Sequence, residues 1–411
     1  MINTNPKLKR NNWVEARITK TSNSFDQAIK EGLTQYVFNN RNEKNVKLID
    51  GTEAIEFVSC SYLGLETHDK LIEGAKAALD KYGLHFSSSR NRFRPPFLDQ
   101  FESLLSEIHD DKPTLAFTSV SSVHLGILPL LGNGSLPSYP VSEKGAYFLI
   151  EKTAHASLQV LRGIYEQLGP VKRFDLNEPG SLEKELAEVN GRTPIVLVDG
   201  VGSMGGLIDL HSILQLVNLY NGYLYIDDAH GTSIIGEKGA GYAFSSFKKD
   251  IPYNVIIAGS LSKAFGGTGG YVVLNDQNDK DIIKKVANPL VFGHSIPLPM
   301  LAANVEAAKL HLNGEVRDLQ KRLWDNTNYL DKLTHNKLFN NSLKSPIRAA
   351  VFNTEEQGFM VAKKLKEEGI LILPAFFPTV ASGTSLIRLA VSALHKEDEL
   401  EVAANVLNEY I

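Results

Sequence analysis

The stretch Gly259-Ser-Leu-Ser-Lys263-Ala-Phe-Gly-Gly-Thr-Gly-Gly270 follows directly on the apolar run Val255-Ile-Ile-Ala258. A lysine amine becomes a nucleophile towards carbonyl groups when desolvation or neighbouring cations lower its pKa. Serines before Lys263 and glycines after it suit an anion such as a phosphate, because bare backbone N–H groups can approach it closely. Taken alone, the stretch fits equally well a glycine-rich loop that carries a solvated lysine.

A second segment, Tyr223-Leu-Tyr-Ile-Asp227-Asp228-Ala-His230-Gly-Thr232, lies about thirty residues upstream. Its apolar residues predict a buried strand with two acids at its C-terminal end, where open α/β sheets bind their ligands. A carboxylate there can pair with a protonated ring nitrogen, and a histidine three residues on can donate to a ring hydroxyl. Together with Lys263, these are the groups that a pyridoxal 5'-phosphate (PLP) site needs. The alternative is that Asp227 and Asp228 cap a loop.

The order Asp227, His230, Lys263 resembles that of fold-type-I PLP enzymes, and more narrowly that of the α-oxoamine synthase family. The resemblance runs from about Phe57 to the C-terminus. It rests on further stretches in the family's order: Ser61-Tyr62-Leu-Gly-Leu65, Ser89-Arg90, His155-Ala-Ser-Leu158, Asp199-Gly-Val-Gly-Ser203-Met-Gly-Gly206 and Ser385-Leu-Ile-Arg388-Leu389. It implies an α/β fold with a mostly parallel, doubly wound sheet in a large domain and a smaller α+β C-terminal domain.

The resemblance also implies roles for single residues. Lys263 would hold PLP covalently and, once released, act as the general base at the substrate Cα. Asp227 would keep the ring nitrogen protonated, and Arg388 would grip the amino-acid carboxylate with its guanidinium. His155 would stack on the ring, and His230, assisted by Ser203, would hydrogen-bond the ring oxygen. The remaining candidates are Tyr62 for the substrate and Ser121, Ser260 and Ser262 for the cofactor.

Four of these residues have plain structural alternatives. His155 could simply begin a helix, and Ser203 could punctuate a glycine-rich turn. Arg388 could pair with a structural acid at a domain interface. Tyr62, beside a Leu-Gly turn, is as easily a core residue as a site residue.

The chain departs from the family pattern where substrate and phosphate are bound. Cys60 replaces an asparagine, which removes one polar contact to substrate. Arg94 and Leu98 stand where a glycine and a histidine are usual. Val120 replaces a glycine near the phosphate, and His294 replaces a threonine by which the neighbouring subunit reaches it. We therefore expect the cofactor more firmly than any particular substrate.

Composition excludes several classes of protein. A net charge of -4 in 411 residues argues against a nucleic-acid-binding surface, and Lys7-Leu-Lys-Arg10 is the one basic cluster. The single cysteine rules out an intrachain disulfide and fits a reducing compartment. No Cys/His pair has metal-ligand spacing, no apolar run reaches the roughly 18 residues of a membrane span, and the N-terminus lacks a signal-peptide core. We expect a soluble cytoplasmic protein.

The pattern along the chain predicts alternating strands and helices, hence a parallel sheet. We expect a polar N-terminal arm with a short helix (1–55), a large PLP-binding domain (56–296), and a linking helix with a small domain (297–411). Strands are predicted at 54–58, 114–117, 146–150 and 195–198, and a loop over 132–144. Helices are predicted over about 68–82, over 297–334 as one long helix, over 354–368 and from about 396.

The expected activity is condensation of a small amino acid of the glycine, alanine or serine class with an acyl thioester (acyl-CoA or an acylated carrier protein). Loss of carbon dioxide then yields an α-aminoketone. One alternative is another fold-type-I PLP enzyme, such as an aminotransferase or aldolase, although the His155 segment is typical of the oxoamine synthases. A second is a non-catalytic synthase subunit, but such subunits lack the lysine found here as Lys263. The resemblance implies a homodimer with its site at the interface.

Overall fold

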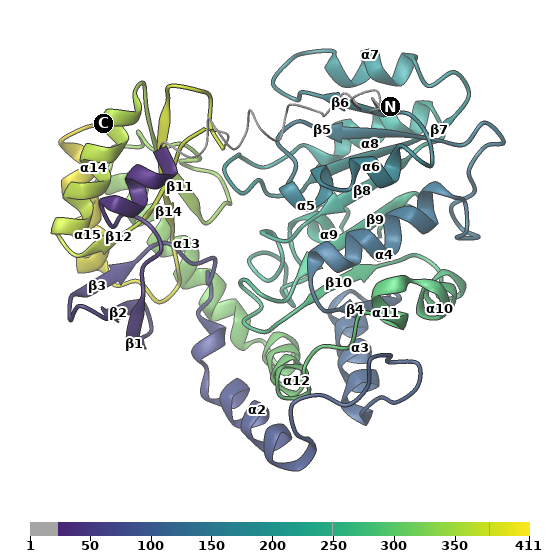
Figure 1. The fold of residues 1–411 in the computed structure, drawn as a ribbon, viewed down its shortest axis with the longest axis horizontal. Helices are drawn as coiled ribbons and strands as arrows, with labels where there is room; N and C mark the ends of the chain where they lie inside the picture. The colour runs from purple at the N-terminus through teal and green to yellow at the C-terminus, as the bar shows by residue number, and fades with distance from the viewer. Residues whose placement is uncertain (1–23, 249, 378) are drawn as a thin grey trace, which may run out of the picture.

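A seven-stranded sheet forms the centre of the larger lobe, on the right in Figure 1. The computed structural model describes residues 24–248, 250–377 and 379–411, so the basic cluster at 7–10 lies outside the described residues. The strand order is β4-β10-β9-β8-β7-β5-β6, and only β10 runs antiparallel to its neighbours. The strands are β4 (Thr114–Phe117), β5 (Ala146–Glu151), β6 (Val171–Phe174), β7 (Thr193–Asp199), β8 (Tyr223–Asp227), β9 (Val255–Ser260) and β10 (Gly270–Val273). The predicted mostly parallel sheet is confirmed.

Both faces of this sheet are buried, because side chains alternate along each strand and both faces carry helices. In β8, Leu224 and Ile226 join one core cluster, while Tyr223 and Tyr225 join the other. The first face is covered by α3 (Pro96–Ile108), α7 (Ser181–Ala187), α8 (Leu210–Leu219) and α9 (Tyr242–Ser246). The second is covered by α4 (Val120–Gly132), α5 (Ala156–Gln159), α6 (Arg162–Tyr165), α10 (Gln277–Val286) and α11 (Asn288–Val291).

The smaller lobe, on the left in Figure 1, combines both ends of the described chain. Its antiparallel sheet has the order β11-β14-β13, formed by Ile347–Phe352, Ser385–Ala390 and Leu373–Ala375. A second sheet has the order β1-β2-β3-β12, formed by Phe38–Asn42, Asn45–Leu48, Glu53–Glu56 and Ile370–Leu371. Residues 38–48 were expected to belong to a polar arm; they form strands instead. Because β3 pairs with β12, the sheet of the smaller lobe includes residues on both sides of position 55, where the arm was expected to end. The three predicted domains and their boundaries stay predictions.

The helix expected over 297–334 is two helices, α12 (Leu298–Leu312) and α13 (Glu315–Leu333), so this prediction was wrong. The chain breaks at Asn313-Gly314, where Gly314 adopts a left-handed φ of 92° that favours glycine. The Asn313 side chain then accepts from the Glu315 N–H and starts the second helix. In Figure 1, α12 lies at the base of the molecule, and α13 rises from it into the smaller lobe.

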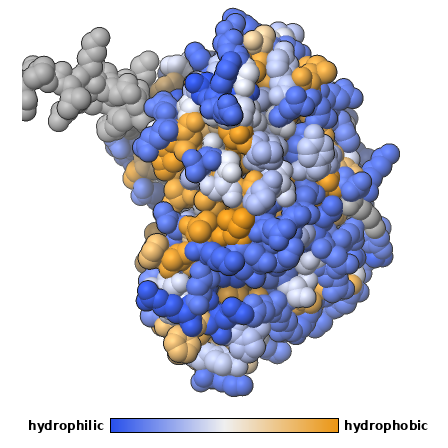
Figure 2. Space-filling view, turned by 90° about the vertical axis from the view of Figure 1, so that its right-hand side faces the viewer, coloured by the Kyte–Doolittle hydropathy of each residue, from blue (hydrophilic) through white to orange (hydrophobic). Residues whose placement is uncertain are grey.

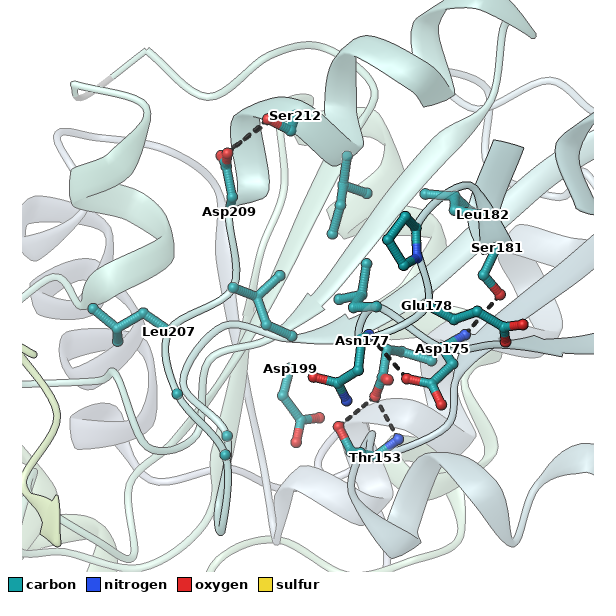
Figure 3. Close-up of a pocket in the computed structure, with 18 of the residues that line it drawn as sticks. Thr153, Asp175, Asn177, Glu178, Ser181, Leu182, Asp199, Leu207, Asp209 and Ser212 are labelled. Atoms are coloured by element: carbon teal, nitrogen blue, oxygen red, sulfur yellow. Dashed lines mark hydrogen bonds between the residues drawn. The ribbon is translucent and has the colours of Figure 1, made fainter. Parts of the chain in front are cut away.

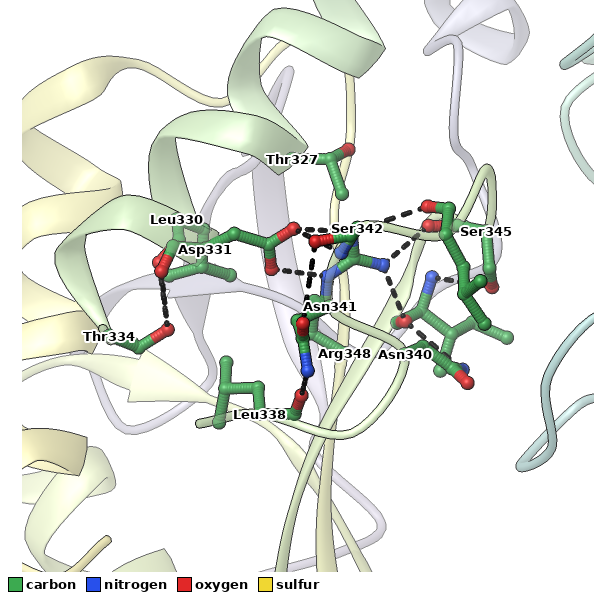
Figure 4. A network of polar contacts seen from close by, with 12 residues as sticks. Thr327, Leu330, Asp331, Thr334, Leu338, Asn340, Asn341, Ser342, Ser345 and Arg348 are labelled. Carbon is green, nitrogen blue, oxygen red and sulfur yellow. Dashed lines mark hydrogen bonds and ion pairs between the residues drawn. The ribbon is translucent and has the colours of Figure 1, made fainter. Parts of the chain in front are cut away.

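A buried ion pair ties α13 to β11 in the smaller lobe. Arg348 is fully buried, and its Nε and Nη2 donate to the two carboxylate oxygens of Asp331 at 2.6 and 2.7 Å (Figure 4). Such a two-pronged pair fixes both position and orientation. In the following loop, Asn340 Nδ2 donates to the Gly205 carbonyl of the larger lobe at 3.0 Å. This loop therefore touches the glycine-rich stretch 202–206.

Other local predictions are confirmed. The helices expected near 68–82, 354–368 and 396 are α2 (Asp69–Tyr82), α14 (Glu355–Glu367) and α15 (Glu397–Asn408). Gly83 follows α2 and Gly369 follows α14, each with a positive φ. The 3-10 turn η1 (Leu65–Thr67) precedes α2. Within the described ranges, no helix combines the length and apolarity needed to cross a bilayer.

Candidate active site

A cavity of about 220 Å³ opens at the carboxyl ends of the central parallel strands, where such sheets bind ligands. Asp227 ends β8, and Lys263 follows β9 by three residues. Seven predicted site residues line this cavity: Ser121, His155, Asp227, His230, Ser260, Ser262 and Lys263. The fold therefore gathers residues that are more than 140 positions apart in the sequence.

The two neighbouring acids Asp227 and Asp228 lie in different surroundings. Asp227 lines the cavity, whereas Asp228 turns into the protein, where its Oδ2 accepts from the Ala243 N–H at 2.9 Å. The Oδ1 of Asp228 is buried without a hydrogen-bond partner, and burial raises the pKa of this carboxyl well above its usual value. Side chains alternate along the chain, so Asp227 faces the cavity while its neighbour Asp228 faces the protein interior.

His124, which the sequence analysis did not single out, holds Asp227. Its Nε2 lies 3.0 Å from Asp227 Oδ2, and its Nδ1 lies 2.8 Å from the Tyr225 hydroxyl. Burial by itself would raise the pKa of Asp227, but the hydrogen bond and charge of His124 and the charge of Lys263 hold it below its usual value. In the sequence, His124 is a lone histidine within an apolar helix, and only the fold brings it to β8.

Asp199 is a second residue that sequence reasoning did not assign to the site. It ends β7 in register with Asp227 on β8, and its Oδ1 accepts from the His155 N–H at 3.1 Å. Burial and the neighbouring negative charge of Asp227 raise the pKa of Asp199 well above its usual value. Burial and Asp227 thus favour the protonated form of Asp199, whereas His124 and Lys263 favour the ionised form of Asp227.

Burial lowers the pKa of the Lys263 amine, and the positive charge of Arg388 acts in the same direction. Cys60, Asp227 and Asp199 oppose this shift without cancelling it. A lysine with a lowered pKa has more of the neutral amine that attacks a carbonyl group.

His155 caps the N-terminus of α5 and also lines the cavity. Its place as a helix cap is therefore compatible with the predicted contact to the cofactor. Its Nδ1 lies 2.7 Å from the Ser157 hydroxyl and accepts from the Ser157 N–H as a helix cap. Burial lowers the pKa of His155, which favours the neutral imidazole that can stack flat on a ring.

A chain of hydrogen bonds joins the cavity to the smaller lobe. His230 Nδ1 lies 2.7 Å from the Tyr62 hydroxyl, and Tyr62 is fully buried. Arg388, on β14, donates from Nη2 to the Tyr62 hydroxyl at 3.4 Å and to Cys60 Sγ at 3.2 Å. Burial and the charges of Lys263 and Arg388 lower the pKa of His230 well below its usual value. Tyr62 and Arg388 thus reach the cavity through His230 and do not line it.

The N-terminus of α4 provides the anion-binding end of the cavity. Ser119 caps this 13-residue helix through a reciprocal hydrogen-bond pair with Ser122, which leaves the backbone N–H groups of Val120 and Ser121 facing the cavity wall. Ser262 also lines the cavity, and its Oγ accepts from the Gly269 N–H at 2.9 Å. Ser121 and Ser260 are further lining residues that carry hydroxyl groups.

This arrangement fits PLP. Its two ends are chemically distinct, with hydroxyls and a helix N-terminus at one and a buried ionised carboxylate at the other. Between them lies an amine of lowered pKa. A phosphate, a protonated ring nitrogen and an aldehyde carbon on one small ring would meet these three groups.

Ser203 is not brought into this cavity. Its loop borders a neighbouring cavity of about 560 Å³, shown in Figure 3, which shares Asp199 with the first. Carboxylates of Asp175, Glu178 and Asp209 lie around it, and no lysine or arginine occurs among its described lining residues. The role given to Ser203 stays a prediction.

Three of the departures from the family pattern lie away from the cavity. Arg94 is exposed and pairs with Asp99 at 2.9 Å, and Leu98 is buried in the core. His294 is exposed, with a left-handed φ of 62°, and its N–H donates to the Ser88 carbonyl. Val120 and Cys60, in contrast, border the site described above.

Known proteins match this chain over most of its length. Residues 52–407 match the family model of aminotransferase class I and II. An 8-amino-7-oxononanoate synthase from Petrotoga mobilis is 30% identical over 366 residues, which covers 86% of this chain and 88% of the relative. A serine palmitoyltransferase from Sphingobacterium spiritivorum is 28% identical over 389 residues, 93% of this chain and 92% of the relative.

Solved structures show the same fold. Serine palmitoyltransferase from Sphingomonas wittichii superposes with a TM-score of 0.82 at 22% identity, covering 95% of this chain and 97% of that one. For 8-amino-7-oxononanoate synthase from Francisella tularensis the TM-score is 0.69 at 23% identity, covering 87% and 97%.

Fold and site together define a fold-type-I PLP-dependent transferase. The chain belongs to the aminotransferase class I and II family and, within it, to the α-oxoamine synthases, which are PLP-dependent C-acyltransferases. The family resemblance read from the sequence is confirmed.

Proposed function

We propose that this enzyme condenses a small amino acid of the glycine, alanine or serine class with an acyl thioester and releases carbon dioxide and an α-aminoketone. One observation supports this most directly. The amine of Lys263 and the carboxylate of Asp227 line one cavity, and Arg388 is joined to that cavity through the Tyr62 hydroxyl and His230.

Each residue has a part that follows from its surroundings. PLP, when bound, withdraws electrons from the amino-acid Cα and so makes its proton acidic. Asp227 keeps a positive charge on the ring nitrogen, because its carboxylate is buried, ionised and oriented by His124. Lys263 holds the cofactor and, once freed, removes the Cα proton.

Arg388 binds the carboxylate of the incoming amino acid. Its Nε is buried without a partner, and the groups that raise its pKa are Tyr62 and Cys60, neither of them an acid that would occupy it permanently. The Tyr62–His230 hydrogen bond links this arginine to the cofactor pocket and fixes the distance between the two ends of the substrate. The alternative was that Arg388 pairs with a structural acid. Among the described residues, no aspartate or glutamate acts on its pKa.

The expected class of amino acid follows from the relatives. The palmitoyltransferase from Sphingobacterium spiritivorum is named for serine, which is one member of the small amino-acid class.

A cavity of about 320 Å³, lined by apolar side chains together with the charged Arg41, Glu43 and Glu56, is the candidate for the acyl chain. Leu373, on its wall, pairs directly with Arg388 across β13 and β14, so the two side chains share one face of the sheet. Ser59, also on its wall, precedes Cys60. The remaining lining includes Tyr36, Phe38, Val46, Leu48, Val58, Leu371 and Ile372. A series of thioesters of increasing chain length should show a maximum in thiol release, at the length that fills this cavity.

We infer a cytoplasmic homodimer. Among the exposed apolar side chains, Phe86 and Phe93 lie together, with ring centroids 5.2 Å apart. Figure 2, which looks at the larger lobe from the right of Figure 1, shows hydrophobic surface collected in a patch among polar surroundings. A patch of this kind typically marks an interface. Light scattering of the purified protein should give twice the mass of the chain.

Borohydride reduction after loading with PLP tests the anchor. The wild type should be yellow and carry fixed cofactor, whereas Lys263→Ala should carry none. Lys263→Arg, which keeps the charge and not the nucleophile, is the matched control and should also carry none. Wild-type protein that takes up no PLP would contradict the proposal. Formation of a keto product without thiol release would favour an aminotransferase.

A further inference from the structure

The Cys60 sulfur accepts a hydrogen bond from the Arg388 guanidinium, the group that the substrate carboxylate needs. The sulfur lies 3.2 Å from Arg388 Nη2, and Cys60 is the only cysteine in the chain. Arg388 is 5% exposed, yet its Nε has no hydrogen-bond partner, so one donor of a buried cation remains for an incoming anion. A buried unpaired donor is costly and marks a place completed by a ligand.

The surroundings of Cys60 favour the thiolate. Burial raises the pKa of this thiol, but the charges of Arg388 and Lys263, with hydrogen bonds from Tyr62 and Arg388, outweigh burial and bring the pKa below its usual value. Cys60 as a residue is only partly buried, so part of its surface is exposed. Reactive cysteines occur in such electropositive and partly exposed surroundings.

We propose that Cys60 is a thiol modification site inside the amino-acid site: its sulfur holds Arg388 until a carboxylate displaces it, and covalent capping of the sulfur blocks amino-acid binding while leaving PLP in place. This inference rests on the proposed function only in assigning the carboxylate to Arg388. The modifying reagent is a soft carbon electrophile.

The reaction needs no oxidant or cofactor. With iodoacetamide as the probe, the thiolate sulfur attacks the methylene carbon, an S–C bond forms, the C–I bond breaks and iodide leaves. The product has lost the negative charge that faced Arg388 and has gained an amide beside it. Because Arg388 donates to Cys60 and Tyr62, the added group lies where the substrate carboxylate must bind.

The test uses the PLP-loaded full-length protein and mass spectrometry of the adduct. We expect alkylation at pH 7 to be severalfold faster than that of N-acetylcysteine, and to be slowed both by glycine or alanine and by propionate, which has no amine. After capping, cofactor should remain fixable by borohydride, while the spectral change caused by amino acids is lost. Cys60→Ser should bind amino acids and take up no label.

Two results would overturn the proposal: an alkylation rate that no carboxylate changes, or capped protein that still responds to amino acids. Failure of the proposed function is a separate result, because it would appear as absence of borohydride-fixed PLP in unlabelled protein. Cys60→Asn, which restores the residue usual in the family, should also resist iodoacetamide while binding amino acids.

Discussion

The floor of the site around Asp227 and its rim around Arg388 are built in opposite ways. The Asp227 carboxylate accepts from His124 and from the Ala229 N–H at 3.0 Å, so both its oxygens are satisfied before any ligand arrives. Arg388 keeps an unpaired Nε and borrows a cysteine sulfur as partner. A floor complete in itself suits a cofactor that stays, whereas an incomplete rim suits a substrate that comes and goes.

The largest effect should come from neutralising the floor. We expect Asp227→Asn to lower the condensation rate roughly 10²–10³-fold, the usual cost of losing one preorganised electrostatic partner. Asp228→Asn is the matched control, because burial raises the pKa of the Asp228 carboxyl and this side chain does not line the cavity, so an amide there should cost little activity. Steady-state kinetics of the two variants decide the matter. Equal losses in both would show that the two acids are not divided as described.

Breaking the rim should affect binding more than turnover. Arg388→Lys keeps the charge but loses the two-pronged fork, so we expect KM for the amino acid to rise about 10–100-fold with a smaller change in kcat. PLP content should match that of the wild type. A large fall in kcat at unchanged KM would place Arg388 in the chemical step and blur the distinction between floor and rim.

His124→Asn tests whether the floor depends on its orienting partner. His124 keeps the pKa of Asp227 low, so its loss should raise that pKa and move the acidic limb of the pH–rate profile to higher pH. At neutral pH the rate should fall about tenfold. Tyr225→Phe, which removes only the outer hydrogen bond to His124 Nδ1, should shift the limb less. An acidic limb unchanged in His124→Asn would mean that Ala229 and Lys263 suffice.

The smallest expected effect is that of Cys60, at the rim, on the pKa of Lys263 in the cavity. The negative charge of Cys60 raises the pKa of Lys263, so Cys60→Ser should lower that pKa further. Because PLP uptake needs the neutral amine, which exists above this pKa, the uptake rate should reach its plateau at lower pH in Cys60→Ser than in the wild type. Stopped-flow absorbance measures the shift. If the plateau of the uptake rate moved to higher pH in Cys60→Ser, the result would contradict a thiolate at Cys60 that raises the pKa of Lys263.

The sequence predicted the floor better than the rim for a physical reason. Asp227 and Lys263 follow strands of a parallel sheet, and strand ends in such sheets meet by construction. The sequence did not predict roles for His124 or Asp199. His124 on α4 and Asp199 on β7 each meet β8 only in the folded protein, and no local pattern around either residue indicates this partner.

The Cys60–Arg388 contact joins positions 328 residues apart. It forms within the smaller lobe, where the Ala390 N–H donates to the Phe57 carbonyl and so brings the end of β14 to the segment that carries Cys60. The broken helix at Gly314 was foreseeable, since Asn-Gly is a common stop signal. The strands at 38–48 lie in a stretch of mostly polar residues, and they form because β1 pairs with β2 and β2 pairs with β3.

One measurement tests the central claim most directly: the yield of thiol and of labelled carbon dioxide when the enzyme is given carboxyl-labelled amino acid and acyl thioester together. The account predicts one carbon dioxide per thiol, with neither released when either substrate is omitted or when Lys263→Ala replaces the wild type. Thiol released without carbon dioxide, or amino acid consumed without thiol, would contradict it.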